Sequence, residues 1–470
     1  MTFLCFFSTF PRIRLAPAAS VVCPRVRIGN PQVKSVAYAT KKKYFPIAPE
    51  RGDGQFLDCD ISNPGYFSSF NLSHCPETTM NNANFTFHVP TKIYFGDNQL
   101  SNLESELKKH GSRCLMIYGS SRIKKTPLYA NIKQVAADAS VILFEAGGVE
   151  PNPRHTTVNR MAAICKKENI GVILAVGGGS VIDCAKFVSA ATFYDGDAWD
   201  FFAGKAKMER FLPVITIPTL AGTGSDMDAF GIVTNENTAE KIPLYHLSLF
   251  PVASFLDPTL TYTVSPYQTA CGAIDAFTHY LEVYFMRPNM GVHILVMEGF
   301  MKAILNAIPR VLANPKDYAA RADIMWASSW ALNGFTFGPT GGVPFTCHWI
   351  EDELSAKYDI THGLGLAILL PRYMEYCLNE QTAPVFRDLA VNVLDVDPAL
   401  PAMIAARKGI ETLEKLFFET CGLKKRLRDC GISDDSRFAE MARIACKNGV
   451  IHGLVDLALD DAVSIYRKSW

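Results

Sequence analysis

A short apolar strand, three consecutive glycines and a helix follow one another directly in the first half of this chain. Val172–Val176 is an unbroken apolar run, Gly177–Gly179 comes next, and a helical pattern starts at Val181. Similar runs alternate with helical patterns on either side; the expected strands are Phe85–Val89, Lys92–Phe95, Cys114–Tyr118, Ser140–Phe144 and Leu212–Ile217, and the expected helices are Leu100–His110 and Thr156–Glu168. Apolar strands that alternate with helices predict an α/β domain whose parallel sheet is covered on both faces.

The glycine run predicts a phosphate-binding turn. Free N–H groups at a helix N-terminus attract a phosphate, and glycine lets it approach the main chain. A second polar loop, Pro218–Ser225, follows the next strand, and ligands of such sheets bind at the carboxyl ends of the strands. The alternative is a tight turn that needs glycine for its backbone angles alone. The pattern is neither a Walker loop nor Gly-x-Gly-x-x-Gly, so we interpret Lys186 as an ordinary helix residue.

The second half of the chain is predicted to be helical. After Pro258 the strand signals fade, and the expected helices are Pro266–Phe285, Gly291–Ala313, Tyr318–Leu332, Phe345–Lys357, Leu364–Cys377 and Pro401–Cys421. Pro371 is expected to interrupt or kink the fifth helix. The predicted organisation is an α/β domain over residues 80–262 and an all-α domain over residues 263–470.

Four residues of the helical half form a candidate metal site. Asp275 and His279 are four apart and share one face of a helix, while His348 and His362 follow on later elements. One carboxylate and three imidazoles suit Zn(II) or Fe(II). The alternative for each residue alone is a structural role in the core.

Residues 1–79 are predicted to lie outside the fold. Residues 1–49 contain eight Lys and Arg and no acidic residue, and residues 50–79 are turn-rich. An acid-free basic leader is typical of a transit peptide, so we expect a mitochondrial or other organellar location. A disordered basic tail is the alternative. The whole chain has 46 basic and 46 acidic residues, so the rest carries 38 bases against 46 acids.

This charge distribution limits the partners of the protein. The excess of positive charge belongs to the leader, which argues against nucleic-acid binding by the folded part. No uninterrupted apolar run approaches the ~18 residues of a membrane span, so no membrane partner is expected. Thirteen cysteines without a Cys-x-x-Cys pair argue against a disulfide framework.

Together these motifs resemble the iron-containing alcohol dehydrogenase family, and most closely its NADPH-dependent butanol dehydrogenase and aldehyde reductase branch. The resemblance runs from about Phe85 to the C-terminus, through Phe87–Gly96, Gly147–Pro153, Gly177–Lys186 and Pro218–Ser225. It implies a dehydroquinate synthase-like fold, a homodimer, a small alcohol or aldehyde as substrate, and Asp275, His279, His348 and His362 as metal ligands. It further implies that the cofactor is lined by Asn152, Gly178, Gly179, Ser180, Asp183, Thr219 and Thr223, with Lys241 near the nicotinamide ribose.

The turn after the strand Cys114–Tyr118 indicates which cofactor is used. NAD-using relatives tend to have an Asp at its start, which binds a ribose diol. Here the turn reads Gly119-Ser120-Ser121, with Arg122, Lys124 and Lys125 nearby. Hydroxyls and cations accept a phosphate dianion, so we expect NADP(H).

Two positions depart from the pattern of the family. Most relatives have a second histidine four residues after the third ligand, where this chain has Asp352. A carboxylate there could accept or relay a proton, so Asp352 and His362 are the expected catalytic residues. Asp228 replaces a usual Asn, and an extra carboxylate near the cofactor could weaken an anionic ligand.

Three other functions remain open at this point. A hydroxyacid–oxoacid transhydrogenase of the same superfamily would suit a mitochondrial leader. A dehydroquinate synthase-like lyase would need further Lys and Arg residues for its substrate, and the helical half shows no such set. An inactive paralogue that acts as a binding protein would be consistent with Asp352 and Asp228, whereas the four metal ligands argue against it.

Overall fold

The computed structural model of the protein describes residues 84–342, 345–447 and 449–470. These residues all belong to one compact unit. The predicted leader and linker, residues 1–79, lie outside the described residues, as do the transit-peptide and localisation predictions made from them.

The first half of the unit is built on a six-stranded sheet in the order β1-β8-β5-β4-β2-β3, in which every neighbouring pair is parallel. Its strands are β1 (Lys92–Phe95), β2 (Arg113–Tyr118), β3 (Ile142–Ala146), β4 (Val172–Gly177), β5 (Val214–Pro218) and β8 (Ala253–Leu256). Alternate residues point to opposite faces, so Leu115 and Ile173 belong to one core cluster while Met116 and Leu174 belong to another. The predicted fold class is confirmed, because this parallel sheet precedes a helical half.

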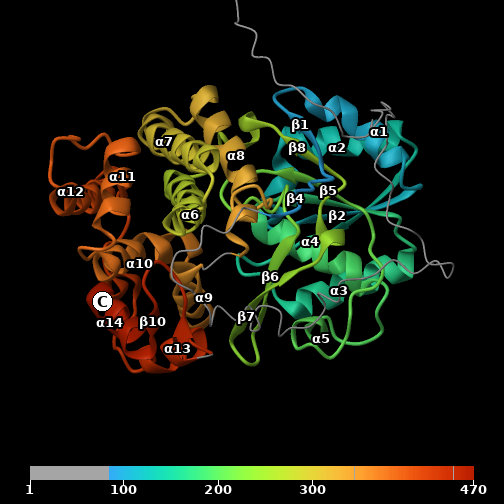
Figure 1. Ribbon diagram of the computed structural model, residues 1–470. Helices are drawn as coiled ribbons and strands as arrows, with labels where there is room; N and C mark the ends of the chain where they lie inside the picture. The colour runs from blue at the N-terminus through green and yellow to red at the C-terminus, as the bar shows by residue number, and fades with distance from the viewer. Residues whose placement is uncertain (1–83, 343–344, 448) are drawn as a thin grey trace, which may run out of the picture. The chain divides into compact units, whose positions relative to one another are not determined.

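Helices cover both faces of the sheet (Figure 1). One face packs against α1 (Leu103–Lys108) and α2 (Pro127–Asp138), and the other against α3 (His155–Glu168) and α4 (Gly179–Ala191). A 3-10 turn at Gln99–Asn102 precedes α1, another at Ser121–Lys125 precedes α2, and the short α5 spans Trp199–Phe202.

A two-stranded antiparallel hairpin stands apart from the main sheet. It consists of β6 (Phe230–Asn235) and β7 (Glu240–Tyr245), and β7 contacts a helix of the second half, α9 (Thr346–Tyr358). The sheet ends at Leu256 and the next long helix begins at Pro266, so the predicted boundary at residues 262 and 263 lies between them.

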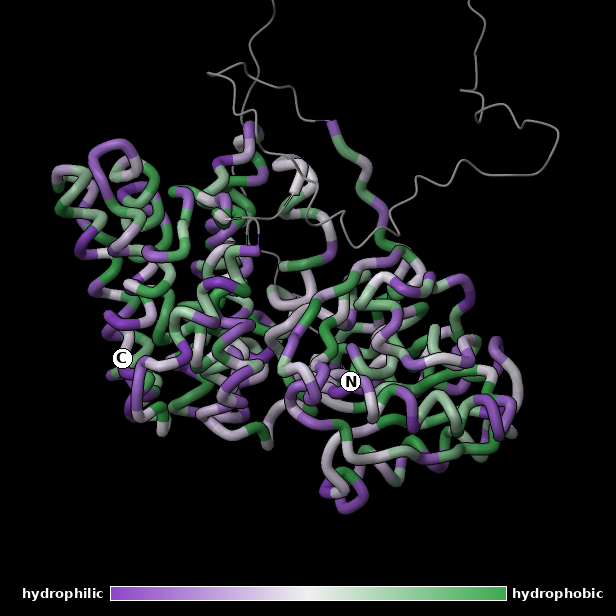
Figure 2. The backbone as a smooth tube through the Cα atoms, turned by 90° about the horizontal axis from the view of Figure 1, so that it is seen from below, coloured by the Kyte–Doolittle hydropathy of each residue, from purple (hydrophilic) through white to green (hydrophobic). Residues whose placement is uncertain are grey.

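The second half is a helical bundle around one large apolar cluster. Its helices are α6 (Pro266–Phe285), α7 (Gly291–Ala313), α8 (Tyr318–Ala331), α9, α10 (His362–Cys377), α11 (Ala383–Asn392), α12 (Ala402–Glu414), α13 (Phe438–Ala445) and α14 (Leu459–Ser469). A small antiparallel pair, β9 (Val450–Ile451) and β10 (Leu457–Ala458), joins the last two helices. Hydrophobic and hydrophilic residues alternate along much of the chain (Figure 2), and α6 differs from a surface helix because it is buried on all sides from Thr269 to Phe285.

Three expectations about local structure were wrong. Phe85–Val89 is not a strand, because Phe85 and Phe87 pack on the rings of His293 and Phe335 in the helical half instead of joining the sheet. The helix expected over Pro401–Cys421 is α-helical only to Glu414, and a π-helical turn follows it over Lys415–Thr420. Pro371 does not interrupt α10.

Among the described residues, α7 is long and apolar enough to cross a membrane by length and composition. One such helix is weak support for a membrane span, because the core helix of a globular bundle meets the same criterion. Met297, Met301, Ile304 and Ile308 of α7 are fully buried in the helical core, whereas Val292 and Leu295 near its start are exposed.

Candidate metal and cofactor site

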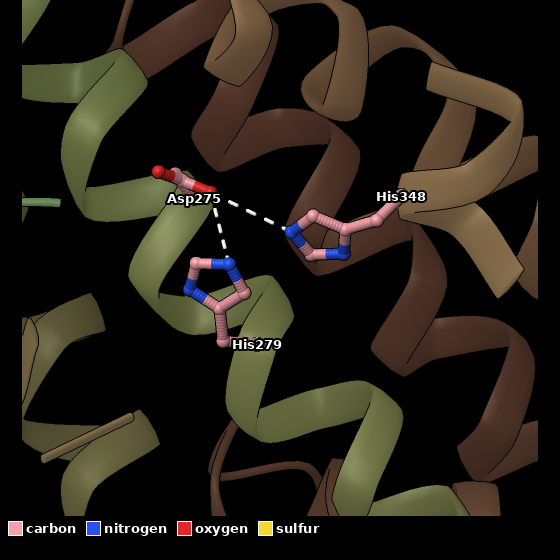
Figure 3. Close-up of side chains that lie close together, drawn as sticks. All are labelled: Asp275, His279 and His348. Atoms are coloured by element: carbon pink, nitrogen blue, oxygen red, sulfur yellow. Dashed lines mark ion pairs between the residues drawn. The ribbon is translucent and has the colours of Figure 1, made fainter. Parts of the chain in front are cut away.

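The four predicted metal ligands lie around a single carboxylate oxygen. Asp275 Oδ1 is 3.5 Å from His279 Nε2 and 3.6 Å from Nε2 of both His348 and His362. Asp275 and His279 share one face of α6, His348 comes from α9, and His362 is the first residue of α10. Figure 3 shows the first two imidazoles directed at the Asp275 carboxylate. The structure thus brings together all four residues chosen from the sequence.

Two of the three imidazoles have a buried carboxylate beside Nδ1, the ring nitrogen that is not directed at Asp275. Glu282 Oε2 pairs with Nδ1 of His348, and Glu351 Oε2 pairs with Nδ1 of His362. Glu282 also accepts a 2.5 Å hydrogen bond from the backbone N–H of Cys347. A carboxylate on Nδ1 fixes the tautomer of a histidine and leaves Nε2 free to bind a metal.

Burial and nearby charges shift the pKa values of His348 and His279 in opposite directions. Burial alone would lower the pKa of His348, but the carboxylates of Glu282 and Asp275 raise it to about 10. Burial lowers the pKa of His279 to about 3 despite the nearby Asp275. The pKa of Asp275 falls well below its ordinary range, because the three imidazoles outweigh the effect of burial.

The donor atoms fit a divalent metal. Asp275 Oδ1 and His348 Nε2 are both buried and neither has a hydrogen-bond partner. Buried polar atoms without partners are costly, and a metal ion bound between them would satisfy both. Three imidazoles and one carboxylate are a donor set that suits Fe(II) and Zn(II) alike.

Sequence reasoning missed Glu282 and Glu351. Glu282 is three residues after His279 on α6, and Glu351 is three residues after His348 on α9, so each shares a helix face with a ligand. The structure also explains why residue 365 is a glycine, because any side chain there would overlap Glu351. Acidic residues at this spacing from a ligand could therefore have been selected.

The glycine run lies where the sequence predicts it, between β4 and α4. Gly178 caps α4, whose first residue is Gly179, and a side chain at Gly179 would overlap Thr223 of the second loop. The two loops therefore meet at the carboxyl ends of β4 and β5. A small cavity beside Gly179 is lined by this second loop and by Met325 and Ser328 of α8.

Several of the predicted cofactor residues are tied to other parts of the protein. Ser180 Oγ donates to the carbonyl of Pro151, and Asn152 Nδ2 donates to Asp359 Oδ1 at 2.9 Å. The Asp183 carboxylate accepts from Ser225 Oγ at 2.5 Å and from the backbone N–H of Ile232. Thr223 Oγ1 accepts from the N–H of Ser225 at 3.2 Å. Thr219 follows β5, and its N–H donates to the carbonyl of Gly177, which joins the two loops.

The predicted cofactor-selecting turn closes the end of β2. Gly119 accepts from the N–H of Gly148, and Ser120 caps the 3-10 turn that begins at Ser121. The nearby cations are not equivalent, because Lys124 forms a 2.8 Å ion pair with Glu145 at the end of β3. Arg122 and Lys125, which were grouped with it, are exposed.

The two family departures are each paired with a lysine. Asp352 Oδ1 lies 2.8 Å from Lys241 Nζ, and this ion pair joins α9 to β7. Asp228 Oδ1 lies 2.7 Å from Lys186 Nζ, and both side chains are almost wholly buried. Burial raises the pKa of Asp228 to about 7, although Lys186 opposes this. Lys186 is thus more than an ordinary helix residue, because it balances a buried carboxylate.

The second loop lies directly on the metal-binding helix. A side chain at Gly272 of α6, one turn before Asp275, would overlap the backbone carbonyl of Ala221. Ser329 of α8 also donates to Asp226 at 2.8 Å. These contacts place the predicted phosphate loop against the helix that carries two of the predicted metal ligands, Asp275 and His279.

Comparisons with known proteins match both halves of the chain. The family described as iron-containing alcohol dehydrogenase matches residues 90–258, and its C-terminal domain matches residues 269–470. NADH-dependent butanol dehydrogenase B of Clostridium acetobutylicum is 40% identical over 82% of this chain and 100% of its own. NADPH-dependent aldehyde reductase YqhD of Escherichia coli is 31% identical over 82% of this chain and 99% of its own. The crystal structure of NADH-dependent butanol dehydrogenase A from Thermotoga maritima covers 82% of this chain and 98% of its own, with 33% identity and a TM-score of 0.77.

Proposed function

Because this chain belongs to the iron-containing alcohol dehydrogenase family, we propose that it interconverts alcohols and aldehydes, using a bound divalent metal and NADP(H). One observation carries the proposal: three histidines converge on the Asp275 oxygen beside loops suited to a phosphate. The named relatives are an aldehyde reductase and butanol dehydrogenases, which supports a small alcohol or aldehyde as substrate.

The bound groups would supply two kinds of chemistry: Fe(II) or Zn(II) polarises the substrate oxygen, and the nicotinamide gives or takes the hydride. The protein supplies position. Glu282 and Glu351 orient His348 and His362, and Gly178 and Gly179 stand at the N-terminus of α4, where free N–H groups would bind a phosphate.

The protein also handles a proton, because an aldehyde gains one proton with each hydride when it becomes an alcohol. Asp352 has a carboxylate oxygen within 4.8 Å of a ring nitrogen of His362, and it pairs with Lys241. We assign this proton transfer to Asp352, at the position where the resemblance to the family would place a histidine.

The preference for NADP(H) over NAD(H) rests on the turn after β2. Gly119 leaves no carboxylate at its start, and Ser121, Arg122 and Lys125 are exposed beside it. Cations and hydroxyls favour a 2′-phosphate. The relatives include both NADH-dependent and NADPH-dependent enzymes, so the preference has to be measured.

Location and assembly complete the proposal. The acid-free basic leader supports import into mitochondria or another organelle, and residues 1–79 fused to a fluorescent protein should carry it there. A diffuse cytosolic signal would contradict this.

Family membership supports a homodimer, and light scattering should give twice the chain mass of 51.8 kDa. A monomer mass would contradict it.

The test is oxidation of NADPH and of NADH with short aldehydes, using protein reconstituted with Fe(II) or Zn(II). We expect turnover that needs metal, with a higher kcat/KM for NADPH. His362→Ala should reduce the rate by at least about a hundredfold, since it removes a metal ligand. His452→Ala is the control, because His452 is exposed and pairs with Asp456. No turnover with any combination would refute the proposed activity.

A further inference from the structure

Lys241 and Asp352 form a buried ion pair beside the predicted metal ligands. Both side chains are buried, with exposed fractions of 5% and 8%. Lys241 comes from the hairpin strand β7, and Asp352 lies on α9 one turn after His348. Among the described residues Asp352 is the ion-pair partner of Lys241, so its ammonium is already neutralised.

Negative charge dominates the surroundings of this pair. Asp275, Glu282, Glu351 and Asp352 are all buried, and their ion pairs are with the three histidine ligands and Lys241. Histidines that bind a metal are neutral, so in the metal-loaded protein four carboxylates against one ammonium and one divalent ion leave one negative charge. Like charges repel strongly where water is excluded, so a further carboxylate on the substrate would be disfavoured.

An apolar side chain borders the same ligands. The ring of Phe345, at the start of α9, lies 5.8 Å from the ring of His279 and 5.1 Å from that of His348. This ring offers no hydrogen-bond donor to an anion, whereas it suits a short alkyl chain.

From these observations we propose that Asp352 excludes carboxylated substrates, by adding negative charge at the metal site and by occupying Lys241. The substrates are then neutral aldehydes and alcohols rather than oxo acids or hydroxy acids. This inference rests on the proposed function and names its substrate class. It also separates that function from a hydroxyacid–oxoacid transhydrogenase, whose two substrates are both anions.

The experiment compares two aldehydes of four carbons, butanal and 4-oxobutanoate, which differ by one terminal carboxylate. In the metal-loaded protein with NADPH, kcat/KM for butanal should exceed that for 4-oxobutanoate by at least about a hundredfold. Asp352→Asn removes one charge and leaves Lys241 free to attract a carboxylate. The ratio should therefore fall at least about tenfold, whatever happens to the absolute rates.

Three further variants show whether this effect comes from the ion pair. Asp352→His restores the usual family residue and should also lower the ratio. Lys241→Met added to Asp352→Asn should remove most of the gain with 4-oxobutanoate, because the freed cation is gone. Glu353→Gln is the matched control, since Glu353 is a buried carboxylate next to Asp352 that makes no ion pair with Lys241. Its ratio should equal that of the unaltered protein.

The outcomes separate the two proposals. Similar kcat/KM values for both aldehydes in the unaltered protein would overturn the inference alone, as would an unchanged ratio in Asp352→Asn. Loss of turnover with both aldehydes in the unaltered protein would overturn the proposed function on which it rests.

Discussion

At the scale of single residues, we expect the charge of Glu282 to set how tightly His348 binds a metal. Glu282→Gln keeps the shape of the side chain and can still accept from the N–H of Cys347, but it no longer holds a charge on Nδ1 of His348. We expect metal affinity to fall about 10–100-fold, as for other carboxylates that support a metal-binding histidine. Competition with a chromogenic chelator measures this.

The control for this substitution is Glu298→Gln. Glu298 is a buried carboxylate on α7 whose partners are Tyr284 and Asn392, away from the ligands. It should leave metal affinity unchanged even if it lowers stability. Equal weakening of metal binding by both substitutions would show that Glu282 acts through packing rather than through His348.

Single residues also show where prediction from sequence stopped. Asp275 and His279 could be paired because helical spacing puts them on one face, whereas His348 and His362 could be added only as histidines on later elements, since spacing along the chain does not show that these elements meet. The sequence did not show that Asp228 pairs with Lys186, which lies 42 positions earlier in the chain. Local patterns do not contain such a long-range contact.

At the scale of elements, the contact between the two loops makes Gly179 sterically critical. Gly179→Ala would press a methyl group into Thr223, which is held by the backbone N–H of Ser225. We expect a loss of about 1–3 kcal/mol in the free energy of unfolding, as for other overpacked sites. Urea unfolding followed by circular dichroism measures it.

Gly178→Ala separates packing from cofactor binding. The nearest atom to a side chain there is Leu220 Cβ at 3.5 Å, so the methyl group fits. This variant should unfold like the unaltered protein but bind NADPH more weakly, because the methyl group would stand where a phosphate approaches the main chain. Gly179→Ala with unaltered stability would contradict the contact between the loops.

Elements with a strong local pattern could be predicted well, including the four-residue strand Lys92–Phe95, whereas the hairpin could not. The bounds of α6 and α7 match the prediction, because each has a long helical pattern and Ser265 and Pro266 mark the start of α6. The hairpin of β6 and β7 was missed, since neither strand is a continuous apolar run and its partner contacts come from α4 and α9.

At the scale of the whole molecule, the predicted metal site joins three helices that are distant in sequence. Its four side chains come from α6, α9 and α10, and α6 also contacts the predicted phosphate loop at Gly272. The unfolded chain has no such arrangement, so a metal that binds the folded form stabilises the entire unit.

We therefore expect removal of the metal to lower the unfolding temperature. At a free metal concentration about a thousandfold above Kd, the loss is about 4 kcal/mol, which corresponds to several degrees for a domain of this size. Scanning calorimetry of the metal-loaded and chelator-treated protein measures the shift, and added Fe(II) or Zn(II) should reverse it. His362→Ala should show a much smaller shift, whereas His452→Ala should show the full one. Metal analysis should first confirm that the ion has been removed. If the unfolding temperature is then unchanged, these four side chains are held in place by their protein partners alone, without a metal.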